Sequence, residues 1–245
     1  MRNKILALIF WILVWQIISM VVGQEILIVS PVLVVKNLIN LIPTTDFWNT
    51  VLFSFSRIVL GFISGVLVAL ILVYFSYKNK IVRELLKPLM SVIKSTPVVS
   101  FIILALIWIS STNLSILISF LMVLPIIYIG VLEGVLNTNN KMLEMAQIFS
   151  VKWYKKFKYI YLPATMPIFV SVCSVGLGFC WKSGIAAEVI GKPTGSIGEK
   201  IYRAKLFLNT GELFAWTIVI IIISMIFEKT FMKLIKILEE RWRYN

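Results

Sequence analysis

The most chemically distinctive stretch of this chain is a polar, basic segment set between two long apolar runs. It extends from Glu144 to Pro167 and reads EMAQIFSVKWYKKFKYIYLPATMP. Met145, Ile148 and Phe149 fall at helical spacing and form an apolar face beside a turn at Ser150. The polar face of the segment carries the lysines at positions 152, 155, 156 and 158. Such a segment can dock onto another protein, or it can lie on the surface of a bilayer.

The local pattern predicts two short helices in this segment, over residues 142–149 and 151–161, with Ser150 at the join. Pro163 and Pro167 follow the second helix. Because proline removes a backbone donor and restricts the residue before it, we expect these two prolines to end that helix and redirect the chain.

Three charged side chains lie inside or at the edges of apolar runs: Arg57, Lys182 and Glu188. Arg57 precedes 20 uncharged residues, which indicates the outer boundary of a span, where it either reaches the interface or forms part of a gate. Lys182 is about 22 Å into its predicted helix. Since a charge there costs on the order of 3 kcal/mol, it lines a path, forms an ion pair or extends to the interface. Glu188 follows Lys182 by six residues, so the two side chains do not lie on the same face of the helix.

Small residues recur every four positions in the same regions. Gly61 and Gly65 share one face of a helix with Arg57, and Gly176 and Gly184 share another with Glu188. Such faces let neighbouring helices approach closely. The two cysteines, at positions 173 and 180, lie in an apolar run of a chain without histidine, so neither a metal site nor a disulfide framework is expected.

Composition places these residues in a membrane protein. Of 245 residues, 60% are hydrophobic and 14% are charged, against roughly 25% charged in soluble domains. We expect an all-α integral membrane protein with one domain over residues 1–245. A helix needs about 20 apolar residues to cross a bilayer, and this predicts six spans, near residues 5–22, 47–77, two within 97–132 separated at 110–113, 168–187 and 213–227.

The distribution of basic residues predicts the orientation. With the N-terminus inside, the inner segments hold 17 lysines and arginines and the outer segments hold five. Basic loops stay in the cytoplasm, so both termini and the segment at 144–167 are expected there. The net charge of +13 then reflects topology and contact with lipid, and no soluble basic domain is present to bind nucleic acid.

Several motifs in order resemble one transporter family. The loop resembles the EAA loop of bacterial ABC-transporter permeases, with Ser150 in place of the usual glycine, at the positions Glu144, Ala146, Phe157, Leu162, Pro163 and Pro167. The stretches SRIVLGF at 56–62, KP at 87–88 and STP at 95–97 resemble the nitrate/sulfonate/taurine branch of that family, which includes thiamine-precursor permeases. The run WKSGIAAEVIG at 181–191 does so as well. The resemblance covers about residues 47–229.

The resemblance implies a type I ABC importer permease in a bacterial inner membrane, without a cofactor of its own. It implies two copies of a separate ATPase, an extracytoplasmic binding protein, a permease homodimer and a small anionic or heterocyclic solute. The residues implied to couple to the ATPase are Glu144, Ala146, Ser150, Phe157, Leu162 and Pro163. Those implied for a path or gate are Lys182, Glu188 and Arg57.

Two other classes stay open from the sequence. A membrane-embedded enzyme would need converging polar groups within the spans, and histidine is absent while acids there are nearly so. An ion-coupled secondary transporter usually has internal repeats, and none is evident here. The chain has no phosphate-binding loop of the form GxxxxGK[ST], so it cannot bind ATP in that manner.

Overall fold

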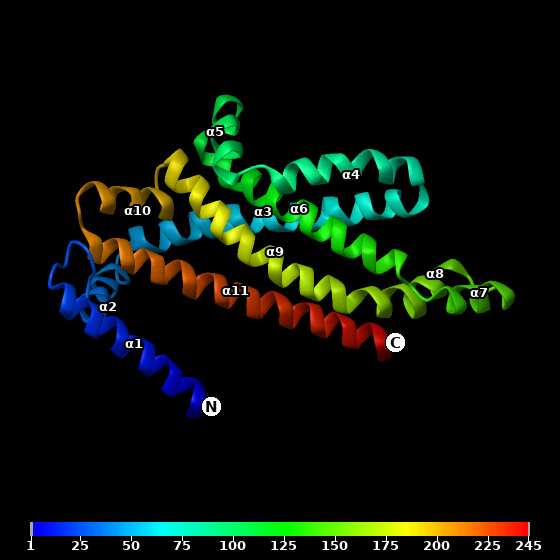
Figure 1. The fold of residues 1–245 in the computed structure, drawn as a ribbon, viewed down its shortest axis with the longest axis horizontal. Coiled ribbons are helices and arrows are strands. Elements are labelled where there is room, and N and C mark those ends of the chain that lie inside the picture. The colour runs from blue at the N-terminus through cyan, green and yellow to red at the C-terminus, as the bar shows by residue number, and fades with distance from the viewer. Residues whose placement is uncertain (1, 245) are drawn as a thin grey trace.

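The computed structural model describes residues 2–244, and within this range the chain forms helices and no strands (Figure 1). The predicted all-α membrane fold is therefore confirmed. The helices are α1 Arg2–Val22, α2 Pro31–Leu41, α3 Thr45–Lys78, α4 Lys80–Ser95, α5 Val98–Trp108, α6 Ser111–Leu136, α7 Asn140–Ile148, α8 Trp153–Lys156, the π-helical segment η1 Phe157–Tyr161, α9 Leu162–Gly191, α10 Ile197–Leu206 and α11 Thr210–Tyr244.

The predicted number of about six spans is confirmed. Five helical segments are long and apolar enough to cross a membrane, and they correspond to α1, α3, α6, α8 through α9, and α11. A bent pair, α4 and α5, whose axes meet at 103°, makes a sixth when the pair is counted as one span. The prediction of a separate span at the start of 97–132 was wrong, because α5 has only 11 residues and follows the bend at Thr96. The short helix α2 was not predicted.

Helix α6 lies at the centre of the bundle, between α3 and α9, and small residues bring these helices together. A methyl group at Gly61 would lie 2.6 Å from the carbonyl oxygen of Ile116 and from Cβ of Ser119. One at Gly184 would lie 2.7 Å from Cγ1 of Ile58. These distances are too short for real contacts, so the absence of side chains at Gly61 and Gly184 sets the helix spacing.

The other two glycines of the predicted faces pack less tightly. A methyl group at Gly65 would lie 3.1 Å from Cβ of Val123, and one at Gly176 would lie 3.7 Å from the Ile127 side chain. All four glycines therefore face neighbours within one chain. The neighbours that these glycines need are therefore supplied by the same chain, and the glycines do not require a second copy.

Helix α1 stands apart from the bundle and contacts it at one end only (Figure 1). Its Trp15 ring lies 5.8 Å from the ring of Phe214 in α11, and Ser19 Oγ donates a hydrogen bond to the carbonyl of Ile28. The turn that follows α1 is held by Thr210 Oγ1, which donates to the carbonyl of Ile26. The end of the bundle that contains α10 thus fixes α1 in place.

The segment after Lys152 differs most from the expectation. Residues 153–191 form one continuous helical element, and Pro163 and Pro167 lie inside it. They neither end a helix nor turn the chain. The π-helical segment η1 directly precedes Pro163. A local π adjustment of this kind lets a helix in a membrane satisfy the carbonyls that proline leaves without a donor.

The contact at Gly61 generates a stability prediction. We expect Gly61→Ala to destabilise the protein by about 1–3 kcal/mol, because the added methyl group meets the backbone of α6. This should lower the Tm of the purified protein in detergent by several degrees, measured by differential scanning fluorimetry. Gly178→Ala is the matched control, since nothing lies within 4 Å of its added methyl group. Equal Tm values for the two variants would contradict the proposed packing.

Candidate functional site

The α7–α8 loop, residues 140–156, is a compact helix–turn–helix with a defined turn. The Asn139 side chain caps α7 by accepting a hydrogen bond from the backbone N–H of Lys141 at 3.0 Å. At the other end the Val151 N–H donates to the carbonyl of Ala146 at 2.9 Å. Ser150 has a φ of 50°, in the left-handed region that glycine adopts most easily. The turn therefore lies where the sequence predicted it, at the position where glycine is usual.

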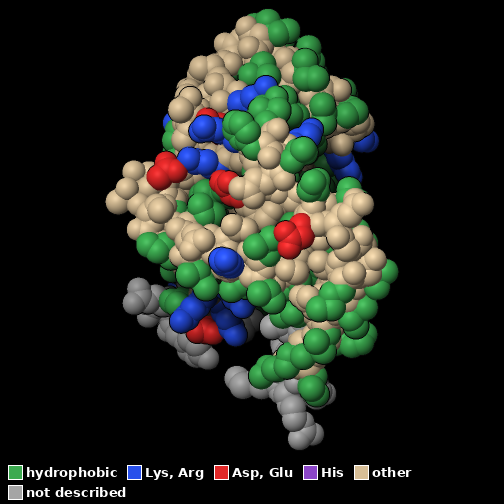
Figure 2. All heavy atoms as spheres, turned by 90° about the vertical axis from the view of Figure 1, so that its left-hand side faces the viewer, with side chains coloured by type: hydrophobic (Ala, Val, Ile, Leu, Met, Phe, Trp, Pro, Cys, Tyr) green, Lys and Arg blue, Asp and Glu red, His purple; other side chains and the backbone are tan. Residues whose placement is uncertain are grey.

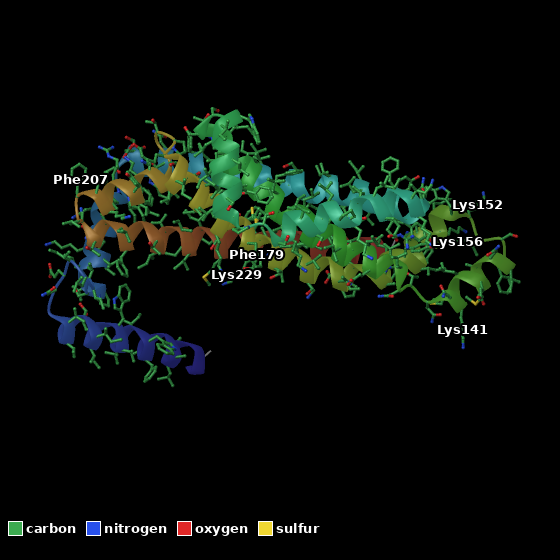
Figure 3. All side chains as sticks on the ribbon, turned by 45° about the horizontal axis from the view of Figure 1, so that its top comes forward. Lys141, Lys152, Lys156, Phe179, Phe207 and Lys229 are labelled. Carbon is green, nitrogen blue, oxygen red and sulfur yellow. The ribbon has the colours of Figure 1, made fainter. Side chains whose placement is uncertain are left out.

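The loop exposes apolar side chains instead of burying them. Ala146 is 3% exposed and packs inside the turn, whereas Ile148, Phe149 and Trp153 are 80%, 74% and 73% exposed. The loop forms one tip of the molecule, and Lys141, Lys152 and Lys156 mark it in Figure 3. A protruding turn of this kind, with large exposed apolar groups, has the character of a protein-docking surface.

The loop is connected to the bundle through one helix and one side-chain contact. Phe157 lies in η1, and Leu162 and Pro163 begin α9, so the predicted residues follow one another along a single helical element. The hydroxyls of Tyr161 and Tyr77 form a hydrogen bond, which ties this junction to the end of α3. A displacement of the loop is therefore transmitted directly into α9.

Glu188 lies at the opposite end of α9, in a buried polar cluster with Ser54, Ile197 and Gly198. It is 1% exposed. Its Oε2 accepts hydrogen bonds from Ser54 Oγ at 2.7 Å and from the Gly198 N–H at 3.2 Å, and Ser54 Oγ accepts from the Ile197 N–H at 2.9 Å. The carboxylate thus faces the N-terminus of α10, where the helix dipole favours negative charge. This cluster joins α3, α9 and α10.

A second contact fastens α10 at its surface. Lys200 Nζ lies 2.6 Å from Oδ2 of Asp46 at the start of α3. Figure 2 looks onto this end of the molecule, where lysine and arginine side chains are interspersed with carboxylates among apolar groups. Helix α10 is therefore a fixed platform with a mixed-charge surface.

Arg57 contacts two other residues of the same chain. Its Nε donates to the carbonyl of Thr112, at the start of α6, at 2.6 Å, and its guanidinium carbon lies 3.6 Å from the centre of the Phe53 ring. These contacts hold the side chain, which is well inside α3, beside the start of α6. A part in an outer gate stays a prediction.

Lys182 lies on a face of α9 that the rest of the chain does not cover. Its side chain is exposed, as are the neighbouring residues Gly178 and Phe179. A side chain added at Gly178 would meet nothing within 4 Å. The exposed face of α9 is thus open around a positive charge, and Lys182 and Glu188 point in different directions, as their spacing predicted.

One intramembrane acid was missed by the sequence analysis. Ser174 Oγ donates a hydrogen bond to Oε1 of Glu228 at 2.6 Å, which joins the middle of α9 to α11. Figure 3 accordingly places Lys229 beside the middle of the bundle. Because Glu228 directly follows an apolar run, it looked like the end of a span. The hydroxyl of Ser174 at mid-helix is the only signal that could have revealed its partner.

The α7–α8 loop, Glu188 and Lys182, which were predicted from the sequence as functional, lie in three separate parts of the structure and do not form one cluster. The α7–α8 loop and the Glu188 cluster lie about 50 Å apart along the helix that starts at Trp153. The exposed face with Lys182 lies between them.

Comparison with known proteins gives one family. Residues 58–244 match the family described as "Binding-protein-dependent transport system inner membrane component". The chain is 25% identical over 235 residues to the putative aliphatic sulfonates transport permease protein SsuC of Bacillus subtilis (strain 168), covering 95% of this chain and 84% of that protein. It is 24% identical over 220 residues to the taurine transport system permease protein TauC of Escherichia coli (strain K12), covering 87% and 80%.

Among solved structures, a chain of an amino acid ABC transporter with histidines has a similar fold. Its TM-score is 0.50 at 19% identity, and the match covers 85% of this chain and 94% of that one.

Proposed function

The chain belongs to the family of binding-protein-dependent transport system inner membrane components, and from this premise we propose that it is the permease subunit of an ATP-driven importer. It forms the path through the membrane for a solute that an extracytoplasmic binding protein delivers. A separate ATPase, present in two copies, supplies the energy. The α7–α8 loop and both termini lie in the cytoplasm, consistent with the excess of basic residues in those segments.

The observation that carries the proposal is the α7–α8 loop. Ile148 and Phe149 would stay in water in an isolated chain, so a partner that buries them gains hydrophobic free energy. Ala146 and the left-handed turn at Ser150 hold them in a fixed position. Since residues 153–191 continue as one helix, movement of a partner bound to the loop displaces α9 and the path that it borders.

The proposed solute is a small anion of the sulfonate or taurine type. The names of the relatives in Bacillus subtilis and Escherichia coli support this class. The uncovered Lys182 supports a negatively charged group on the solute, because a lysine inside a membrane is favourable only where water, a partner or an anion meets it. The binding protein is expected to select among members of the class.

We propose further that two copies of this chain enclose the path. The face of α9 around Gly178 and Lys182 is open in one chain, and its lysine would be unfavourable against lipid. A second copy related by two-fold symmetry, the commonest arrangement in assemblies, would place two such faces opposite each other. The glycine faces of α3 and α9 do not enter this argument, since α6 covers them.

The docking proposal predicts the effect of one loop substitution. Ile148→Glu should abolish uptake of the solute and weaken ATPase binding at least about tenfold, because a buried isoleucine contributes about 1.5–3 kcal/mol. Binding is measured by co-purification of the ATPase with the tagged permease at increasing dilution.

Gln147→Glu is the matched control. It adds the same charge at an adjacent exposed position without removing an apolar group, so it should retain most of the binding. Both variants should insert at the wild-type level. Normal ATPase binding and uptake by Ile148→Glu would mean that the loop lies on the lipid surface.

The two-copy proposal predicts a stoichiometry. The complex purified with its ATPase should contain two copies of this chain and two ATPase subunits, because each copy presents one α7–α8 loop. Native mass spectrometry measures this composition directly. A complex with one copy, or with a second and different permease, would refute the homodimer and leave the docking proposal intact.

A further inference from the structure

Helix α4 has three distinct faces. The first face packs on the bundle. Met90 and Ile93 are 1% and 7% exposed and belong to the main hydrophobic core, and Leu86 packs against it. Arg83 on this side donates from Nε to the carbonyl of Ser76 at the end of α3. None of the six spans predicted from the sequence includes this segment, yet α4 runs back along α3 and α6 (Figure 1).

The second face of α4 is apolar and uncovered. Ile81, Leu85, Leu89 and Val92 are 70%, 69%, 50% and 58% exposed, and their spacing of three and four residues puts them in one stripe. A stripe of large aliphatic side chains beside the apolar surface of α3 is suited to contact with lipid acyl chains. Its presence indicates that α4 lies within the bilayer.

The third face is polar and also uncovered. Glu84, Lys87, Ser91 and Lys94 follow at intervals of three, four and three residues and are all exposed. Among the described residues, neither Lys87 nor Lys94 takes part in an ion pair. Lys94 lies about 21 Å from Lys80 along the helix, well beyond the reach of an interfacial charge.

These faces cannot all meet the same surroundings. A lysine in the hydrocarbon of a bilayer is strongly unfavourable, so intramembrane lysines face a water-filled cavity or a partner group. Two lysines and a serine on one side of a helix, with aliphatic residues on the other, indicate a boundary between water and lipid. The single carboxylate, Glu84, lies near the entrance, and beyond it the polar face carries positive charge only.

We propose that the polar face of α4 lines an aqueous vestibule on the inner side of the membrane, in which Lys87 and Lys94 attract anions. The side is set by the start of α4, which adjoins the end of α3 at Tyr77, and Tyr77 in turn contacts the helix of the α7–α8 loop at Tyr161. The inference rests on the proposed function, and it adds to Lys182 a second positively charged site along the path of an anionic solute.

Thiol labelling tests the vestibule without requiring transport. Ser91→Cys lies between the two lysines on the polar face, and Val92→Cys, one residue on, is the matched control on the apolar face. The native cysteines at 173 and 180 are buried and can remain. Each variant, assembled with its ATPase in inside-out membrane vesicles, is treated with an anionic methanethiosulfonate, the ethylsulfonate, or a cationic one, the ethyltrimethylammonium compound.

Ser91→Cys should react, and its anionic-to-cationic rate ratio should exceed that of a cysteine at the exposed position 137, outside the α7–α8 loop, by on the order of tenfold. Adding Lys94→Gln should reduce this excess several-fold. Val92→Cys should not react with either reagent. These results together would establish a water-filled, anion-attracting face.

Each other outcome overturns the inference. An unreactive Ser91→Cys means that lipid or a second copy covers the face. Equal reaction at Ser91→Cys and Val92→Cys means that α4 stands in water outside the bilayer. Reaction without charge preference removes the attraction for anions. Normal ATPase binding and uptake in the Ile148→Glu experiment would contradict the proposed function alone, so the two failures are distinguishable.

Discussion

The continuity of the helix from Trp153 to Gly191 is the constraint on which the rest of the structure depends. Within a bilayer no water is available to bond a freed carbonyl, so a chain that breaks its helix there pays several kcal/mol per group. The π-helical segment before Pro163 lets the helix continue past two prolines. One continuous helical element therefore carries the α7–α8 loop at one end and Glu188 at the other.

Polar residues in the bundle fall into two groups, those that other helices bury and those that stay uncovered. Glu188 and Ser54 are buried and mutually hydrogen-bonded, and they fasten α10 to α3 and α9. Lys182 and the polar face of α4 are uncovered. Buried polar groups thus fasten α10 to the bundle, and uncovered ones border the proposed path, where water or a solute can meet them.

Much of this architecture is readable from the sequence, because long apolar runs and helix-spaced small residues leave few alternatives in a membrane. The spans, the turn at Ser150 and the inward-facing glycines followed from such patterns. The prediction that Pro163 and Pro167 end a helix was wrong, because the effect of proline in water differs from its effect inside a packed membrane helix. Glu228 was missed because its partner, Ser174, is 54 residues away in the sequence, on another helix.

The continuity of residues 153–191 is tested most directly by a distance. Spin labels at Lys155 and Lys192, on doubly labelled chains diluted into unlabelled ones, should lie about 55 Å apart in a single narrow distribution. Pulsed electron–electron double resonance should give the same distance with and without nucleotide bound to the ATPase, because the helix moves as one body. A second, shorter distance that depends on nucleotide would show a hinge at the prolines and contradict the account.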